Sequence, residues 1–360
     1  MPASNLISLD VAIRNIKSNF KKISNEDVFL QNSLGRCLAE PIYSKIDNPK
    51  YDVSSMDGYA INFKDFTELT SNNKNNSKKT INFKVIGESS AGNPFEKKIK
   101  NFEAVRIFTG AKVPRGCDVV IIQENVRTSS DQIYISTQSN IIKYQNIRKK
   151  GLDFKKGECI FNIGSLIKSR HLGSIAMTGQ TWLTVTRKPV VSILSTGNEI
   201  LKVGEQLTKD QIPSGNNLML AAMVTEFGGI PRILPIADDN EDNIYNILGK
   251  ALDSDLIVTT GGVSVGKYDL IQKALKNFKG KSQNEFWKIA MRPGKPLLFS
   301  KVNNTPLIGL PGNPVSSGIC SLIFVNIAIR TMLGVTEEYP IFEKATLDGV
   351  LPVNDERMDF

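Results

Sequence analysis

The fold can be read outward from positions 190–199, whose sequence is VVSILSTGNE. An apolar run typical of a short buried strand is followed there by a polar turn that contains a glycine. The same order recurs downstream, where the apolar run 256–259 precedes the glycine-rich stretch 261–266. Each repetition predicts a strand whose carboxyl end opens onto a loop.

Helical patterns separate these strands. Residues 218–227 predict a helix that ends at Gly228 and Gly229, and residues 232–236 predict another strand. Apolar residues at helical spacing follow in two further segments: Ile244, Ile247, Leu248 and Ala251, then Ile271, Ala274, Leu275 and Phe278. Such alternation predicts a three-layer α/β domain with a mostly parallel sheet, assigned here to residues 183–335. Ligands of these sheets bind beyond the carboxyl ends of the strands.

Two loops near the end of this region add positive charge. Segment 286–296 contains Lys288, Arg292 and Lys295 around a Pro-Gly pair, and loop 309–316 predicts a helix with Asn313 as N-cap. Fixed-φ proline, permissive glycine and a helix N-terminus together suit an anion. For either loop alone, an ordinary tight turn flanked by solvated lysines is the alternative. The 261–266 run matches neither a P-loop nor a dinucleotide fingerprint.

The N-terminal half predicts a different architecture. Short alternating runs at 82–86, 105–108, 119–123 and 132–136 indicate a small β-rich domain over residues 48–143. Segments on both sides of it predict a helical and extended linking domain, residues 1–47 plus 144–182, into which the β-rich domain is inserted. The fold expected is therefore a multidomain chain that combines α/β and β domains.

Composition excludes several classes of function. The 360 residues are 41% hydrophobic, and the first twenty contain no apolar run long enough for a signal or membrane segment, so we expect a cytoplasmic protein without a membrane partner. The net charge of +9 is spread along the chain, which argues against nucleic acid and favours a small anionic substrate. Because His171 is the only histidine, a histidine-based triad or multi-histidine metal site within one chain is impossible.

Four carboxylates are candidates for chemistry, and each has a structural alternative. Asp57, in Met-Asp-Gly-Tyr, could be a turn residue, and Glu199 could interact with a helix dipole. Asp238 and Asp269 each follow an apolar strand and a short loop, so both could reach one hard cation. The alternative for Asp238 or the adjacent Asp239 is a helix N-cap.

Several motifs together resemble one family, the molybdopterin molybdenumtransferases, a similarity shared by the gephyrin E domain. The matching stretches occur in the family's order and are LGRCLAE (34–40), SSMDGYA (54–60), RIFTGA (106–111), LSTGNE (194–199), the 261–266 run with Asp269, segment 286–296, and GLPGNPVS (309–316). They span most of residues 1–335, and as a set they are highly specific although each alone is weak.

The resemblance implies insertion of molybdate into adenylylated molybdopterin, with Mg²⁺-dependent release of AMP. It implies that Asp57, Thr109, Asp153 and Glu199 are catalytic and that Asp238 and Asp269 hold magnesium. The substrate-binding residues expected are Gly261, Gly262, Ser264, Lys288, Arg292, Lys295, Asn313 and Ser316. It further implies a homodimer whose cleft lies between the two halves of different subunits, with molybdopterin adenylyltransferase and molybdoenzymes as transient partners.

The chain departs from the family pattern in two places. Arg292 stands where the family has lysine, which replaces a point charge by a planar bidentate donor. Family members also continue into a C-terminal β domain, and residues 336–360 resemble only its beginning, so an arginine and a serine that it contributes are expected to have no counterpart here. Two alternatives therefore stay open: a molybdopterin adenylyltransferase, and a pterin-binding scaffold without catalysis.

Overall fold

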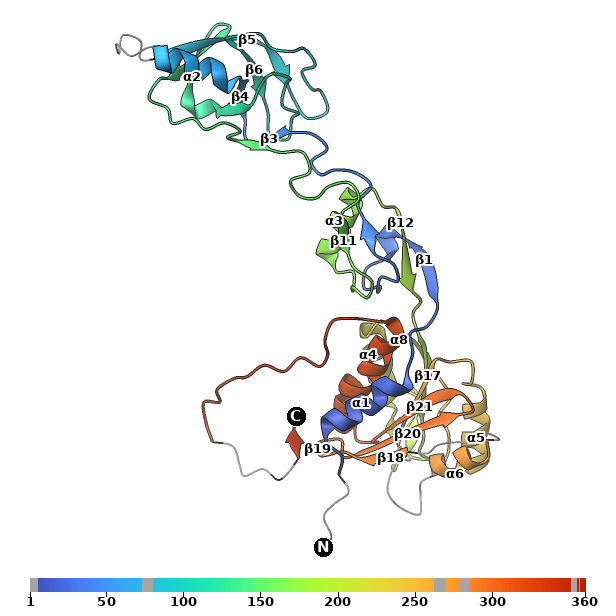
Figure 1. The fold of residues 1–360 in the computed structure, drawn as a ribbon. Helices are drawn as coiled ribbons and strands as arrows, with labels where there is room; N and C mark the ends of the chain where they lie inside the picture. Colours follow the sequence, from blue (N-terminus) through green and yellow to red (C-terminus); the bar gives the residue numbers. More distant parts are fainter. Residues whose placement is uncertain (1–5, 73–79, 262–269, 279–284, 351–354, 356) are drawn as a thin grey trace. The chain divides into compact units, whose positions relative to one another are not determined.

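The chain folds into two compact units. The computed structural model describes residues 6–72, 80–261, 270–278, 285–350, 355 and 357–360. The α/β unit comprises Met1–Glu40, Asn162–Leu172 and Trp182–Phe360, and the β unit comprises Pro41–Phe161 and Gly173–Thr181. Both units are drawn in Figure 1, and each is described by itself below. The finer boundaries of the linking, β-rich and C-terminal domains stay a prediction.

A six-stranded sheet forms the centre of the α/β unit. In spatial order its strands are β16 (Ile230–Ile233), β13 (Val190–Ser195), β17 (Leu256–Thr260), β21 (Thr305–Leu310), β20 (Pro296–Val302) and β18 (Glu285–Lys288). The first four run parallel, and β20 is antiparallel to both β21 and β18. All five residues of β17 are buried, as expected for a central strand covered on both faces. The predicted mostly parallel sheet is confirmed.

Helices cover both faces of this sheet (Figure 1). One face packs against α1 (Leu9–Asn19), α4 (Gly215–Glu226), α7 (Pro314–Cys320), the π-helical turn η3 (Ser321–Val325) and α8 (Asn326–Leu333). The other face packs against α5 (Glu241–Gly249) and α6 (Leu270–Lys276). Helix α1 begins at Leu9, and the Ser8 side chain caps it by accepting the Val11 N–H at 3.4 Å.

The helical stretch Pro314–Leu333 is long and apolar enough to cross a membrane by length and composition alone. Most of it, 61%, is buried inside the protein. Buried residues such as Phe324 and Ile329 belong to the same core as the central strands. The stretch is therefore the core helix of the α/β unit.

The β unit is built on a second six-stranded sheet. Its spatial order is β7 (Val119–Ile122), β4 (Gly58–Ile61), β6 (Glu103–Ile107), β5 (Thr80–Ser89), β9 (Gln132–Ser136) and β8 (Val126–Ser129). Helix α2 (Phe63–Asn72) packs its Phe66 into the apolar core of this sheet, beside Phe83 and Ile133. The predicted β-rich N-terminal half is confirmed.

Smaller elements complete both units. They are β1 (Asn25–Phe29) paired with β12 (Trp182–Thr186), β2 (Ile42–Tyr43) with β11 (Cys159–Phe161), β3 (Val53–Ser54) with β10 (Ile147–Arg148), β14 (Ile200–Leu201) with β15 (Ile212–Pro213), β19 (Met291–Arg292) with β22 (Met358–Asp359), helix α3 (Ser169–Met177), and the 3-10 turns η1 (Leu30–Asn32) and η2 (Gln123–Asn125).

Several element boundaries differ from the sequence prediction, most clearly in α4 and β16. Helix α4 begins at Gly215 rather than at residue 218, and β16 ends at Ile233 rather than at residue 236. The apolar residues Leu234 and Ile236 continue the strand-like pattern, but the register with β13 ends at Ile233 and only the Leu234 N–H adds one further bond, to the Ile193 carbonyl. Apolar patterning marks the strand but not its end.

Candidate active site

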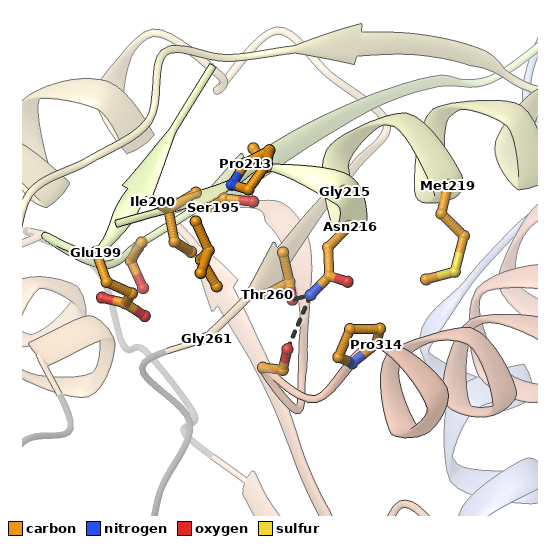
Figure 2. A pocket seen from close by; sticks show the side chains of 14 residues that line it. Ser195, Glu199, Ile200, Pro213, Gly215, Asn216, Met219, Thr260, Gly261 and Pro314 are labelled. Atoms are coloured by element: carbon orange, nitrogen blue, oxygen red, sulfur yellow. Dashed lines mark hydrogen bonds between the residues drawn. The ribbon is translucent and has the colours of Figure 1, made fainter. Parts of the chain in front are cut away.

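A pocket of about 430 Å³ opens at the carboxyl edge of the parallel sheet (Figure 2). Strands β13, β17 and β21 end side by side at Ser195, Thr260 and Leu310, so the loops that follow them meet there. The pocket is lined by Ser195, Thr196, Glu199, Ile200, Ile212, Pro213, Ser214, Gly215, Asn216, Met219, Thr260, Gly261, Gly312 and Pro314. Among the candidate residues taken from sequence, Glu199 and Gly261 lie in this lining.

Gly261 is required by the close approach of two loops. Its φ is +87°, and a Cβ built on it would lie 2.8 Å from the backbone oxygen of Thr196. A Cβ on Gly312 would come within 3.5 Å of the Gly261 Cα. A side chain at Gly261 would therefore push apart the loops that form the pocket. Gly262, Ser264 and Asp269 lie outside the described residues.

Asn216 ties three parts of the pocket together and was missed by the sequence reasoning. Its amide Nδ2 donates to Thr260 Oγ1 at 3.0 Å and to the Gly312 carbonyl at 2.9 Å, as Figure 2 shows. Thr260 in turn donates to the carbonyl of Pro311 at 3.3 Å. The start of α4 is thus joined to the loops after β17 and β21. A helix start placed at residue 215 would have been the signal, but the predicted helix began at residue 218.

Glu199 is the only charged residue among the described residues that line the pocket. Its carboxylate folds back over Gly197, where φ is +145° and a Cβ would lie 2.5 Å from a carboxylate oxygen. The glycine therefore leaves the space that the Glu199 side chain fills. The walls opposite are apolar, from Ile200, Ile212 and Met219. This combination suits a flat ring that carries hydrogen-bond donors better than it suits an anion.

Asp238 lies next to this pocket, in a separate hollow of about 350 Å³ that also includes Asn198. Its carboxylate accepts a hydrogen bond from the Asn243 amide. The N-cap of α5 is Asn240, whose Oδ1 accepts from Asp242 N at 2.9 Å, so the capping alternative for Asp238 does not hold. Asp238 is exposed and forms no ion pair with any described residue. Its charge is available to a cation.

Three or more potential metal ligands do not cluster anywhere in the described part of the chain. The second predicted ligand, Asp269, falls outside that part. A magnesium ion in proteins commonly uses one or two carboxylates and takes its other ligands from water and substrate phosphates. The exposed, unpaired carboxylate of Asp238 fits such a partial site.

The predicted cationic loop lies at the same edge of the sheet as the pocket. Strand β20 runs antiparallel to β21, so its first residue, Pro296, lies where β21 ends, and Lys288 pairs with Pro296. Lys288 and Lys295 are both exposed. Gly294 between them has φ +108°, and a Cβ there would lie 2.6 Å from the Cys320 sulfur. Only glycine lets this loop pack onto the helix that contains Cys320.

Arg292 forms a bidentate ion pair that the sequence did not reveal. Its Nε and Nη2 donate to the Asp359 carboxylate at 2.7 and 2.8 Å, and β19 pairs in parallel with β22. This guanidinium holds the pKa of Asp359 below its ordinary value. A second pair, Arg357 with Asp355, lowers the pKa of Asp355 to about 2, with a smaller contribution from Arg292. Arg357 thus lies close enough to Arg292 and Asp359 for their charges to influence one another.

Asn313 caps helix α7, as predicted, by accepting hydrogen bonds from Val315 N at 3.0 Å and Ser316 N at 3.2 Å. Pro314 occupies the first turn. The Asn313 side chain is therefore engaged with its own helix. Ser316 lies in the same turn, close in sequence to the pocket residues Gly312 and Pro314.

In the β unit, Asp57 and Thr109 form one small site. Asp57 Oδ1 accepts from both the backbone N–H and the hydroxyl of Thr109, each at 2.8 Å. These bonds, and the charge of Arg106, lower the pKa of Asp57, so it is a carboxylate at neutral pH. The next residue must be glycine because β4 and β7 are in close contact there. A Cβ on Gly58 would lie 1.9 Å from the Ile121 carbonyl oxygen.

Asp153, also in the β unit, is held separately. Both of its carboxylate oxygens lie 2.7 Å from Arg148 Nη2, and Oδ2 also accepts from Asn48 Nδ2 at 3.1 Å. Within the described residues, no hydrogen bond or ion pair joins Asp153 to Asp57 or Thr109. The structure therefore brings Asp57 and Thr109 together but leaves Asp153 in a separate network.

Comparison with known proteins identifies two regions of the chain with family models. Residues 7–179 match the family model "MoeA N-terminal region (domain I and II)", and residues 192–331 match "Probable molybdopterin binding domain". A molybdopterin molybdenumtransferase of Staphylococcus epidermidis is 32% identical over 342 residues, which cover 95% of this chain and 79% of that protein. One from Haemophilus influenzae is 37% identical over 290 residues, covering 80% of this chain and 68% of the relative.

Solved structures extend the match to the fold. A molybdopterin biosynthesis MoeA protein of Pyrococcus horikoshii superposes with a TM-score of 0.81 at 27% identity, over 98% of this chain and 86% of that one. A second structure of the protein from the same organism gives 0.74 at 30% identity, over 91% and 80%. Sequence models, curated relatives and fold agree over most of the chain. The chain belongs to the molybdopterin molybdenumtransferase family, the transferases of molybdenum cofactor biosynthesis.

Proposed function

We propose that this chain inserts molybdate into adenylylated molybdopterin and releases AMP. The observation that carries the proposal is the pairing, at one sheet edge, of a pocket with a single carboxylate and a separate loop with exposed cations. Such an edge can bind a molecule with an uncharged ring at one end and anionic groups at the other. Adenylylated molybdopterin has this division, since its pterin ring is neutral and its phosphates are charged.

The pocket is the proposed site of the pterin ring. Glu199 would accept hydrogen bonds from ring N–H groups, and Ile200, Ile212 and Met219 would contact the ring faces. Gly261, together with Gly262 and Ser264, would bring backbone and hydroxyl groups to the substrate from the loop after β17. Catalysis by the protein would then rest on position and electrostatics, without a covalent nucleophile.

The cationic loop is the proposed site of the anions. Lys288, Arg292 and Lys295, with the helix start at Asn313 and Ser316, would hold molybdate and the charge that develops on the phosphate. Arg292 enters this role already paired with Asp359, so an oxyanion would have to share or displace that carboxylate. The two lysines have no such partner among the described residues and would bind the anion first.

Magnesium is the proposed cofactor, with Asp238 and Asp269 as its protein ligands. A bound magnesium ion would polarise the phosphate that is cleaved. Asp269→Asn should abolish magnesium-dependent AMP release while leaving the fold intact, because the amide keeps the shape but loses the charge that a hard cation requires. Unchanged AMP release at saturating substrate would remove Asp269 from the metal site.

The working unit is proposed to be a cytoplasmic homodimer that exchanges intermediates with an adenylyltransferase and with molybdoenzymes. Asp57, Thr109 and Asp153 would face the α/β unit of another subunit. Mixing Asp57→Asn protein with Asp269→Asn protein should then restore part of the activity through hybrid dimers. Absence of rescue, with subunit exchange confirmed independently, would count against a shared site.

Turnover assays separate this function from its two alternatives. AMP release that depends on molybdate supports insertion. Consumption of ATP with molybdopterin supports adenylylation, and binding of the adenylylated pterin without either reaction supports a scaffold. The match of residues 7–179 to a MoeA N-terminal model favours the first outcome.

A further inference from the structure

In the β unit, the guanidinium of Arg106 is held between two aromatic rings and forms no ion pair with any described residue. The guanidinium carbon lies 5.0 Å from the Tyr59 ring centre and 4.9 Å from the Phe108 ring centre. Among the described residues it has no carboxylate partner, whereas Arg148 of the same unit is bonded to Asp153. Aromatic faces attract a cation without neutralising it. The positive charge therefore remains available to act on other groups.

Arg106 donates hydrogen bonds to two residues that adjoin Asp57, namely Gly58 and Gln123. Its Nη1 donates to the carbonyl of Gly58, the residue that follows Asp57, at 3.3 Å. Its Nη2 donates to Gln123 Oε1, and the Gln123 backbone N–H donates to the Asp57 carbonyl at 3.1 Å. Arg106 thus binds two residues, Gly58 and Gln123, that are themselves joined to the Asp57 backbone, one by the peptide bond and one by a hydrogen bond. The register explains why, since Arg106 lies opposite Tyr59 and Gly58 lies opposite both Ile107 and Ile122.

Thr109 and Arg106 are the residues that stabilise the negative charge of Asp57. Thr109 supplies two hydrogen bonds to Oδ1, and no hydrogen bond within the described residues uses Oδ2. The nearby acids are Glu124, next to Gln123, and Glu88, which lies opposite Arg106 across β5. Arg106 is the charged group that lowers the pKa of Asp57, after the two Thr109 bonds.

We propose that Arg106 is the positioning residue of the Asp57 site: it adds positive potential beside the Asp57 carboxylate and fixes the backbone that presents Oδ2 to the substrate. This inference rests on the proposed role of Asp57 in the transfer reaction. Arg106 itself does not touch the reacting atoms in this assignment. Its two functions, charge and shape, predict different results for lysine and for an uncharged side chain at position 106.

The test is a carbon NMR titration of Asp57 in the full chain, with the signal assigned through Asp57→Asn. In Arg106→Met, the Asp57 pKa should rise by about 0.5 to 1 unit, the size expected for one lost charge near a protein surface. In Arg106→Lys the pKa should stay within about 0.3 unit of the original, because the charge remains. The acid limb of the kcat profile should move with the Asp57 pKa in Arg106→Met.

Arg127→Met is the matched control. Arg127 is an exposed arginine on β8 of the same sheet, so its loss removes one charge without touching Asp57. In Arg127→Met the Asp57 pKa should be unchanged. A shift below about 0.2 unit in Arg106→Met, or an equal shift in both variants, would overturn the proposal.

Two further measurements test the proposal independently of Arg106→Met. If Arg106→Met does not fold, the wild-type titration at raised salt replaces it. Salt should screen the charge of the half-buried Arg106 and raise the Asp57 pKa, and a pKa independent of salt would refute the proposal. In Arg106→Lys, kcat should fall about tenfold while the pKa is kept, because the planar fork to Gly58 and Gln123 is lost. The NMR arm needs no turnover, so failure of the proposed function would be seen separately as inactive wild-type protein.

Discussion

The candidate residues Asp57 and Thr109 in the β unit are bonded to each other, whereas most of the charged candidates in the α/β unit have no ion-pair partner among the described residues. In the β unit, Asp57 is held by Thr109 through two bonds of 2.8 Å and lies under the influence of a fixed arginine. In the α/β unit, the salt bridges of the described residues include no partner for Glu199, Asp238, Lys288 or Lys295. If both are substrate sites, we expect the Asp57 site to be organised before substrate binds and the sheet-edge site to become ordered on binding. Substitutions in the β unit should therefore change kcat, and those at the sheet edge should change KM.

The largest effect on stability is expected from Gly58→Ala, which changes the backbone next to Asp57. The added Cβ would meet the Ile121 carbonyl at 1.9 Å, so β4 and β7 must separate. We expect a loss of at least about 3 kcal/mol in the stability of the β unit, measured by urea unfolding followed with probes in that unit.

Two glycine controls make this experiment a comparison of the units. Gly197→Ala would meet the flexible Glu199 side chain rather than backbone, so its cost should be about 1–2 kcal/mol, from the left-handed conformation alone. Gly173→Ala, in α3 with nothing within 4 Å of the new Cβ, should be neutral or slightly stabilising. Equal losses at Gly58 and Gly197 would contradict the distinction between a rigid and an open site.

Asp57→Asn comes next. If the Asp57 carboxylate acts in the transition state as proposed, its loss of charge should lower kcat about 100-fold with little change in KM. Asp153→Asn is the matched substitution in the same unit. Because Asp153 is bonded to Arg148 and Asn48, we expect this variant to lose stability and keep most of its kcat. Equal kcat losses for both would place Asp153 in the catalytic set with Asp57.

Asn216→Ala probes the open site and should have a smaller effect. Losing the bonds to Thr260 and the Gly312 carbonyl releases the loops around the pocket. KM for the adenylylated pterin should rise about tenfold, corresponding to one or two lost hydrogen bonds, with kcat changed less. Asn216→Asp keeps the size but cannot donate to the carbonyl, so it should resemble alanine. A fall in kcat at constant KM would contradict the assignment to binding.

The smallest effect is a pH dependence at strand β22. The pKa values of Asp355 and Asp359 are lowered by Arg357 and Arg292, with that of Asp355 at about 2. Their contribution to holding the strand is present above the ordinary aspartate pKa of about 3.9 and is lost as the pH falls toward the lowered values. The NMR shift of the Phe360 amide, which donates to the Arg292 carbonyl at 2.9 Å, should change in that range. In Asp359→Asn the change should shrink, and an unchanged titration there would exclude the Asp359 pair as its cause.

Local features were predictable because their causes are local. Ser8 caps α1 and Asn313 caps α7 through residues that are neighbours in the chain, and the strand β13 follows from a short apolar run. The motifs around Asp57, Glu199 and the cationic loop were also found directly. The start of α4 was missed because Ser214 forms no side-chain cap, so Asn216 fell outside the predicted helix.

The amino-acid sequence by itself determined the layered α/β unit, the β-rich half, the family and the types of side chain available for chemistry. Periodicity and glycine placement are properties of short segments, which is why they could be read in this way. Only the tertiary structure decided which of those side chains meet. Arg106 reaches Asp57 through a sheet register, Arg292 meets Asp359 across 67 positions, and Asn216 binds Gly312 across 96. Contacts so distant in sequence arise from strand pairing and core packing, which no local pattern records.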